Sequence, residues 1–393
     1  MDRPLSAPEE AAAGPKRGTS ARKPRAQGQN GHPPDGPAAV RRINLALQGG
    51  GAHGAFTWGA LDRLLEDETI EIAGVSGCSA GALNAVALKA GLAEGGRARA
   101  REVLDGLWKG VAATGDLRLT DWMTAFLPAL RGTIKFMEAA LPVSPLDLTT
   151  AVFSPYAYGA VYRNPLQPVV EGLNFTEVCQ KAGPETFISA TNVRTGKIRV
   201  FSGAEITTEA VLASACLPTV FQAVEIDDPA TGRREAYWDG GYSGNPALFP
   251  LFDPKLPDDI VVVNINPLIR QELPFTAPDI QNRVNEISFN ASLLSEMRAI
   301  AFVKRLIADG KVAEGAMKDV NLHMIADDAL MNELSAVTKL LPTPAFVDRL
   351  KEAGRQAADR FLSRHGDCLN RSSSMDVGGT LARTPRSPEA RPS

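Results

Sequence analysis

Three glycine-rich turns carry the residue types that acyl transfer to a serine requires. The first reads Gly-Gly-Gly-Ala-His-Gly over 49–54, the second Gly-Cys-Ser-Ala-Gly over 77–81, and the third Asp-Gly-Gly over 239–241. Glycine-rich backbone can offer N–H groups to an oxyanion, Ser79 is a candidate nucleophile, and Asp239 can accept the serine proton. Because each turn follows an apolar stretch, the three together indicate this chemistry more strongly than any one alone.

Ser79 occupies the centre of a G-x-S-x-G pentapeptide. The pentapeptide lies between a strand candidate at 70–75 and a helix candidate at 82–90. At such a strand-to-helix turn the glycines permit a tight backbone, the serine Oγ is exposed, and the helix N-terminus favours developing negative charge. A turn selected only for close packing of a strand on a helix would have the same composition, so the motif alone leaves both interpretations open.

The first glycine turn also has a competing interpretation. Gly49, Gly51 and Gly54 satisfy the dinucleotide-binding pattern G-x-G-x-x-G. That pattern requires an acidic residue at the end of the second strand to bind the ribose. Here the acidic cluster of 66–71 comes before or at the start of that strand, and its end carries Ser79. The sequence therefore favours an oxyanion loop over a nucleotide site.

The base that would activate Ser79 has two candidates. Asp239 follows an aromatic strand candidate and has an ordinary carboxyl pKa of about 3.9, which burial would raise toward a useful value. The order Ser79, Asp239, His323 would also suit a Ser-Asp-His triad of the α/β-hydrolase type. His323, however, alternates within 321–325 as a strand residue does. We expect it to be structural, and we keep the triad as the alternative.

The apolar patterns predict the elements that would position these residues. Strand–turn–helix patterns occur twice, over 43–65 and 70–90, which indicates a parallel βαβ start and an α/β sheet. Two hairpins are expected at 186–201 and 221–238, and a strand buried on both faces at 260–265. A long helix follows, with an apolar stripe that we expect to pack on the core rather than dock on a membrane. The stripe consists of Ile280, Val284, Ile287, Ala291, Leu294 and Ala301.

Composition excludes several classes of protein. The 393 residues are 44% hydrophobic, enough for a sizeable core, and the net charge of −3 argues against nucleic acid as a partner. The four cysteines show no C-x-x-C spacing, so neither a zinc site nor a disulfide framework is predicted. We expect no metal and no cofactor.

The ends of the chain differ from its body. Residues 1–40 are rich in Ala, Gly, Pro, Lys and Arg and contain no apolar signal-peptide core, so a disordered basic arm is expected. A disordered tail is expected over 366–393. No stretch of about 18 apolar residues is present, so a membrane-spanning helix is not predicted. The expected location is cytoplasmic, with peripheral membrane contact left open.

In this order the three turns resemble those of the patatin-like phospholipase family, over roughly 42–268. The segment 213–221 also looks like the helix end that precedes the Asp motif in that family. The resemblance implies a three-layer α/β/α fold with a mainly parallel central sheet. It further implies a Ser79–Asp239 dyad that hydrolyses acyl esters of lipids or phospholipids without a metal. The implied oxyanion loop consists of Gly49, Gly50, Gly51 and Gly54.

Two positions depart from the pattern of this family. His53 stands where the family commonly has Arg or Lys, and Cys78 stands where Thr or Ser is usual. The first departure puts in question any stabilisation by positive charge near the oxyanion loop. Neither departure removes a catalytic group.

The resemblance also suggests a division of the chain. Residues 41–268 would form the catalytic domain. Its segment 117–162, with Trp122 and Phe126, would either cap an acyl-chain cleft or form an ordinary helical insertion packed on the core. Residues 269–365 would form a mainly helical extension packed on that domain. A catalytically silent acyl-binding or interaction module is the alternative from a different class. The sequence leaves the head group, the positional specificity and the oligomeric state open.

Overall fold

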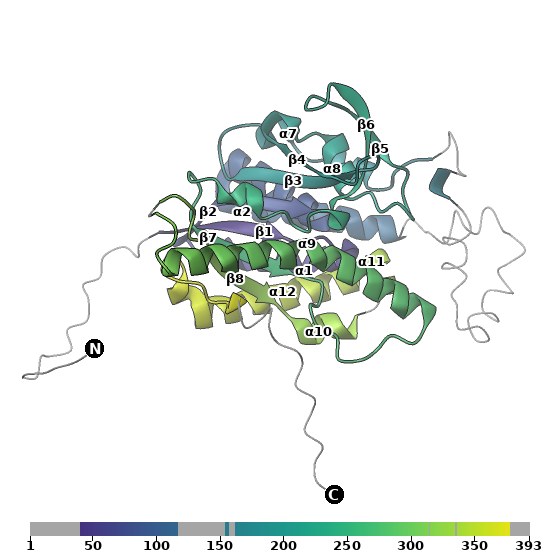
Figure 1. Ribbon diagram of the computed structural model, residues 1–393. Coiled ribbons are helices and arrows are strands. Elements are labelled where there is room, and N and C mark those ends of the chain that lie inside the picture. The colour runs from purple at the N-terminus through teal and green to yellow at the C-terminus, as the bar shows by residue number, and fades with distance from the viewer. Residues whose placement is uncertain (1–39, 117–153, 157–161, 314, 335, 378–393) are drawn as a thin grey trace, which may run out of the picture. The chain divides into compact units, whose positions relative to one another are not determined.

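A single sheet of mainly parallel strands forms the centre of the protein (Figure 1). The computed structural model describes residues 40–116, 154–156, 162–313, 315–334 and 336–377. The strand order is β5-β6-β3-β2-β1-β7-β8, with β4 paired to β3. The strands are β1 (Arg41–Leu47), β2 (Ile70–Cys78), β3 (Glu185–Asn192), β4 (Ile198–Ser202), β5 (Val224–Asp228), β6 (Arg233–Asp239), β7 (Asp259–Asn264) and β8 (Asn321–Ala326). Neighbours from β8 to β3 are parallel, whereas β4 and β6 pair antiparallel with β3, and β5 pairs antiparallel with β6.

Helices cover both faces of this sheet. The longer helices are α1 (Gly54–Leu64), α2 (Ala80–Asp116, interrupted by non-helical backbone at Gly95 and Gly96), α9 (Ala277–Ala308) and α12 (Pro344–His365). The shorter ones are α6 (Gln167–Glu171), α7 (Phe175–Val178), α8 (Thr208–Ser214), α10 (Asp328–Glu333) and α11 (Ala336–Leu340). Short 3-10 turns are η1 (Gly51–His53), η4 (Gly203–Glu205), η5 (Gly240–Tyr242), η6 (Phe249–Phe252) and η7 (Gly366–Cys368).

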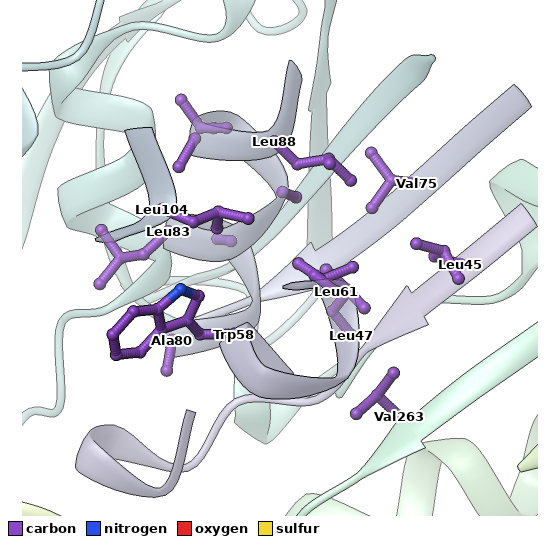
Figure 2. Packing of buried hydrophobic residues seen from close by; sticks show 14 of the residues in the cluster. Leu45, Leu47, Trp58, Leu61, Val75, Ala80, Leu83, Leu88, Leu104 and Val263 are labelled. Carbon is purple, nitrogen blue, oxygen red and sulfur yellow. The ribbon is translucent and has the colours of Figure 1, made fainter. Parts of the chain in front are cut away.

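Alternation along β1 divides the core into two layers. Leu45 and Leu47 pack with α1, α2 and α12, whereas Ala46 packs with α9 and η6. Since successive side chains of a strand point to opposite faces, the two clusters lie on opposite sides of the sheet. Figure 2 shows part of the first cluster, in which Leu61 of α1 lies near Leu47 of β1, and Trp58 of α1 lies near Ala80 of α2. The predicted three-layer α/β/α architecture is therefore confirmed.

The predicted packing of the α9 stripe is wrong for most of its residues, although Ala301 packs on the core. Ile280, Val284 and Ile287 are 47%, 52% and 54% exposed. The buried side of α9 is instead formed by other residues, which include Phe289, Leu293, Met297 and Ile300. Apolar residues lie on two sides of this helix, and helical periodicity identifies a stripe without saying which side meets the sheet.

The C-terminal part of the chain is more integrated than the sequence suggested. The stretch 269–365 is mainly helical, but it also contributes β8, which extends the sheet beyond β7. Order continues past Gly366, where a disordered tail was expected. Leu369 and Val377 are buried, and the Met375 N–H donates to the Leu322 carbonyl. Most of the predicted cap, including Trp122 and Phe126, lies outside the described residues, as do residues 1–39 and 378–393.

Candidate active site

Ser79 forms a strained connection between a strand and a helix. It lies between the last residue of β2, Cys78, and the first of α2, Ala80. Its φ of +53° is in the left-handed region that non-glycine residues rarely adopt. A Cβ added to Gly77 would lie 2.5 Å from the Gly81 carbonyl oxygen, and one on Gly81 would lie 2.0 Å from the Leu47 carbonyl oxygen. The turn therefore requires both glycines of the motif, as a nucleophile elbow does.

The register of β3 brings Asp239 to this turn. Along one edge of β3, β2 runs parallel and ends with Cys78 opposite Ser189. On the same edge β6 runs antiparallel and ends with Asp239 opposite the next residue, Ala190. The other edge of β3 is occupied by β4 over both positions. The two strands consequently meet end to end, which places Asp239 beside the nucleophile turn although 160 positions separate Asp239 from Ser79.

The carboxylate of Asp239 is buried and only half satisfied. Its Oδ1 accepts hydrogen bonds from the Gly241 N–H at 2.8 Å and the Cys78 thiol at 3.6 Å. Its Oδ2 is buried without a hydrogen-bond partner of ordinary geometry. Burial raises the pKa of Asp239 to about 6, against the lowering effect of hydrogen bonds from Gly241, Ser79 and Cys78. Oδ2 is thus the oxygen free to accept a proton.

The glycine loop of 49–54 packs directly on the turn that carries Ser79. A Cβ on Gly49 would lie 2.5 Å from the Ser79 Cβ, and one on Gly54 2.5 Å from the Ala80 Cβ. The N–H groups of Gly49 and Gly54 are already bonded, the first to Asn245 Oδ1 at 2.6 Å and the second within the helix start. Among the described residues, the N–H groups of Gly50 and Gly51 have no partner.

A buried N–H without a partner is rare in folded proteins. Gly50 is buried, and Gly51, with φ +59°, needs the conformational freedom of glycine. Of the four predicted loop glycines, two therefore provide close packing, and Gly50 and Gly51 provide donors available to an anion.

Several supporting residues were not predicted as functional. The Ser214 Oγ of α8 accepts the Ser79 N–H at 2.9 Å, and the Cys216 carbonyl accepts the Asp239 N–H at 2.8 Å. Both lie in the 213–221 segment, so the segment was identified but not its role. Gln48 and Asn266 follow the carboxyl ends of β1 and β7, where parallel sheets place their functional groups. Their position after the carboxyl ends of parallel strands could have marked Gln48 and Asn266 as candidate site residues in the sequence.

His53 and Cys78, the two residues that depart from the family pattern, are uncharged in the structure. Burial lowers the pKa of His53 to about 3, with a further lowering by the nearby Lys339. Its Nε2 pairs with Thr338 Oγ1 at 2.9 Å, and the ring is neutral at physiological pH. Cys78 is fully buried and its pKa is raised well above the ordinary value, first by burial. Its thiol is therefore unreactive toward external reagents.

The structure does not bring His323 to Ser79 or Asp239. His323 lies on β8, and its Nε2 pairs with Asp259 Oδ1 at 2.9 Å while its Nδ1 pairs with Ser374 Oγ at 2.9 Å. Both ring nitrogens are thus hydrogen-bonded at the β8 edge of the sheet, three strands from β2. The geometry does not support the alternative triad.

We predict that His323→Gln keeps its activity and loses stability. The substitution weakens a buried contact to Asp259, so the free energy of unfolding should fall by about 1–3 kcal/mol. Hydrolysis of a soluble ester should stay within about twofold of wild type. Thermal unfolding and ester assays on the same preparation check both. A folded His323→Gln protein without activity would support the alternative Ser-Asp-His triad.

The comparison with protein families agrees with this geometry. The chain belongs to the patatin-like phospholipase family, whose sequence profile matches residues 45–252. No curated protein matches the chain at a significant level. Family membership supports activity as a lipid acyl hydrolase.

Solved structures show more distant likenesses. VipD from Legionella pneumophila is 16% identical, with 84% of this chain and 68% of VipD covered and a TM-score of 0.37. Human GIVD cytosolic phospholipase A2, solved with methyl gamma-linolenyl fluorophosphonate, is 14% identical, with 84% and 59% covered and a TM-score of 0.35. The ExoU–SpcU complex of the Pseudomonas aeruginosa type III secretion system gives 16% identity, 88% and 75% coverage and a TM-score of 0.28. This chain thus spans less than two thirds of the human phospholipase.

Proposed function

We propose that the protein hydrolyses acyl esters of lipids through a Ser79–Asp239 dyad. The observation that carries the proposal is the buried Asp239 carboxylate, whose Oδ2 has no partner, beside a serine held at φ +53°. Ser79 Oγ attacks the ester carbonyl carbon while Asp239 accepts its proton. The alcohol leaves with a proton returned from Asp239, and an acyl-serine remains. Asp239 then takes a proton from water, whose oxygen attacks the acyl-serine, and Ser79 regains its proton as the fatty acid leaves.

Two features lower the barrier to the first step. The pKa of Asp239, raised by burial to about 6, makes the carboxylate a stronger base than an exposed aspartate while leaving it ionised at pH 7. The N–H groups of Gly50 and Gly51 would hold the negative charge that develops on the carbonyl oxygen. One such donor is worth about 10²–10³ in rate. The chemistry uses only a hydroxyl, a carboxylate and backbone, so the proposal includes no metal or cofactor.

The substrate class is tested with three substrates in parallel. Wild type would be incubated with phosphatidylcholine vesicles, a triacylglycerol emulsion and a soluble nitrophenyl butyrate, and product release measured against a Ser79→Ala blank. Hydrolysis of the soluble ester and of one lipid supports the proposal and separates phospholipid from neutral lipid. Hydrolysis of none of the three would favour the silent acyl-binding module.

We further propose that the outward side of α9 contacts the lipid surface. Ile280, Val284 and Ile287 are exposed there at helical spacing, and the preceding loop exposes Leu273 at 75% and Phe275 at 86%. Uncharged apolar side chains gathered on one side of a helix are typical of an interfacial contact. None of the helices in the described part of the chain is both long and apolar enough to cross a bilayer.

Charge on α9 indicates which lipid surface would be preferred. Arg298 and Arg305 are exposed on the same side of the helix by their spacing, and neither forms an ion pair among the described residues. Each cation near an anionic membrane contributes about 1 kcal/mol. The inner side of α9 packs Phe289 against Gly241 and Tyr242 of η5, which directly follows Asp239. One helix would thus link the lipid surface to the site.

Replacing Ile280 and Ile287 by serine should separate lipid binding from chemistry. Because both side chains are exposed, folding should be little affected. Binding to vesicles that contain anionic phospholipid, measured by sedimentation, should weaken about tenfold or more, since apolar area no longer enters the interface. Soluble ester hydrolysis should be unchanged. Met317→Ser, which removes an exposed apolar side chain that is not part of α9, is the matched control. An equal loss of vesicle binding and of soluble ester hydrolysis, or unchanged vesicle binding, would contradict this contact.

A further inference from the structure

Lys339 is held against the oxyanion loop. It lies on α11, and a Cβ added to Gly51 would meet the Lys339 carbonyl oxygen at 2.3 Å. Its side chain is 17% exposed. The Nζ donates to Asn266 Oδ1 at 3.3 Å, to Asn282 Oδ1 at 3.4 Å and to Glu286 Oε1 at 3.5 Å. The ammonium group therefore has three hydrogen-bond acceptors around it.

The positive charge of Lys339 is not cancelled by Glu286. The buried Glu286 carboxylate already receives Arg270 at 2.7 Å and Arg283 at 3.4 Å, so three cations surround one anion. His53, the basic residue within the loop sequence itself, is neutral because burial lowers its pKa to about 3. Burial lowers the pKa of Lys339, and the neighbouring Glu286 raises it. Lys339 is the cation that bonds directly to Asn266 beside the loop.

A continuous hydrogen-bonded path leads from Lys339 to the loop backbone. Asn266 accepts from Lys339 through Oδ1 and donates through Nδ2 to the Gly49 carbonyl oxygen at 2.7 Å. The Gly49 carbonyl shares its peptide unit with the Gly50 N–H, and in a trans peptide these two groups point in opposite directions. The path therefore ends at a Gly50 N–H that has no partner among the described residues.

We propose that Lys339 is a positioning residue that polarises the Gly49–Gly50 peptide through Asn266 and so strengthens Gly50 N–H as a donor to the oxyanion. A cation at Oδ1 draws electrons from the Asn266 amide and strengthens its N–H donor. The bond from that donor to Gly49 in turn makes the far N–H more positive, as hydrogen bonds in a chain reinforce one another. The effect is largest where charge develops on the oxyanion, so it raises kcat more than it affects binding.

This inference rests on the proposed function, and kinetics of a soluble nitrophenyl ester test it on the full chain. Lys339→Met should lower kcat about tenfold with KM within about twofold, and Lys339→Arg should recover most of the rate. Asn266→Ala should lower kcat similarly. The combination of Lys339→Met with Asn266→Ala should be no slower than Asn266→Ala alone, because the cation acts through that amide.

Controls separate this role from a structural one. Lys89→Met removes another buried lysine, on α2 with its Nζ on the Ala182 carbonyl, and should leave kcat unchanged in folded protein. Should Lys339→Met fail to fold, Lys339→Gln keeps a neutral donor and makes the same test. A kcat within twofold of wild type, or losses that multiply in the combined variant, would overturn the proposal. Ser79→Ala with wild-type activity would instead refute the proposed dyad itself.

Discussion

Ser79→Ala is expected to lower the rate of ester hydrolysis about 10⁴-fold or more. The hydroxyl is the only protein group in the proposed mechanism that forms a bond to the acyl carbon, and removal of a nucleophile of this kind costs this much in other serine hydrolases. The loss should appear in kcat with both soluble esters and lipids. Initial rates with a nitrophenyl ester, followed over a range of enzyme concentrations, measure it.

Two further variants separate the loss of the nucleophile from a loss of folded structure. Ser76→Ala removes a buried hydroxyl on the same strand, bonded to the Ala247 carbonyl at 2.6 Å, and should retain activity. Ser79→Gly relieves the left-handed backbone at φ +53° and should be inactive in a fully folded protein. Activity in either Ser79 variant close to that of wild type would contradict the assignment of the nucleophile.

Asp239→Asn is expected to lower kcat about 10³-fold while leaving the protein folded. The asparagine Oδ1 can still accept the Gly241 N–H, and its amide group replaces an Oδ2 that makes no hydrogen bond of ordinary geometry. The substitution therefore removes the proton acceptor and little else. Asp228→Asn, which changes a buried aspartate in the β5–β6 hairpin, is a control that should lose stability rather than catalysis.

The pH dependence of the wild-type rate follows from the same residue. Asp239 acts as a base only when ionised, and burial raises its pKa to about 6. Activity should therefore be full at pH 7–8 and fall about tenfold per unit well below pH 6. A rate that stays constant down to pH 4.5 would contradict the assignment of this base.

Asp239 should also affect stability, with a definite sign. Its pKa is higher in the folded than in the unfolded protein, so the folded state binds more protons between about pH 4 and 6. The free energy of unfolding should fall as pH rises through this window, by an amount of the order of 3 kcal/mol. At pH 7 Asp239→Asn should thus be at least as stable as wild type. Urea unfolding of both proteins at pH 4.5 and 7 measures the difference.

The sequence was sufficient to predict the fold class and the candidate dyad. Alternating and continuous apolar runs identified β1, β2, β7 and both hairpins, because strand burial imposes those patterns directly. The dyad residues were identifiable because Ser79 directly follows a strand and Asp239 ends one, each near glycine, where a sheet edge presents side chains. Their joint position depends on β2 and β6 meeting along β3, and no local pattern encodes that pairing.

What the sequence did not reveal depends on contacts between distant segments. The stripe of Ile280, Val284 and Ile287 is as periodic as a core face, and only the packed structure shows that the opposite side of α9 meets the sheet. Lys339 lies far along the chain from Gly49, and its position on the oxyanion loop follows from how α11 packs. The partnerless Oδ2 of Asp239 likewise depends on three-dimensional burial.

Covalent labelling by a fluorophosphonate tests the central claim most directly, because such a probe reacts with an activated serine and not with an ordinary one. Purified protein would be incubated with the probe at pH 7.5 and the modified peptide located by mass spectrometry. We predict one label per chain, on Ser79, with labelling abolished in Ser79→Ala and greatly slowed in Asp239→Asn. No labelling of the folded wild type, or labelling at another serine, would contradict the dyad.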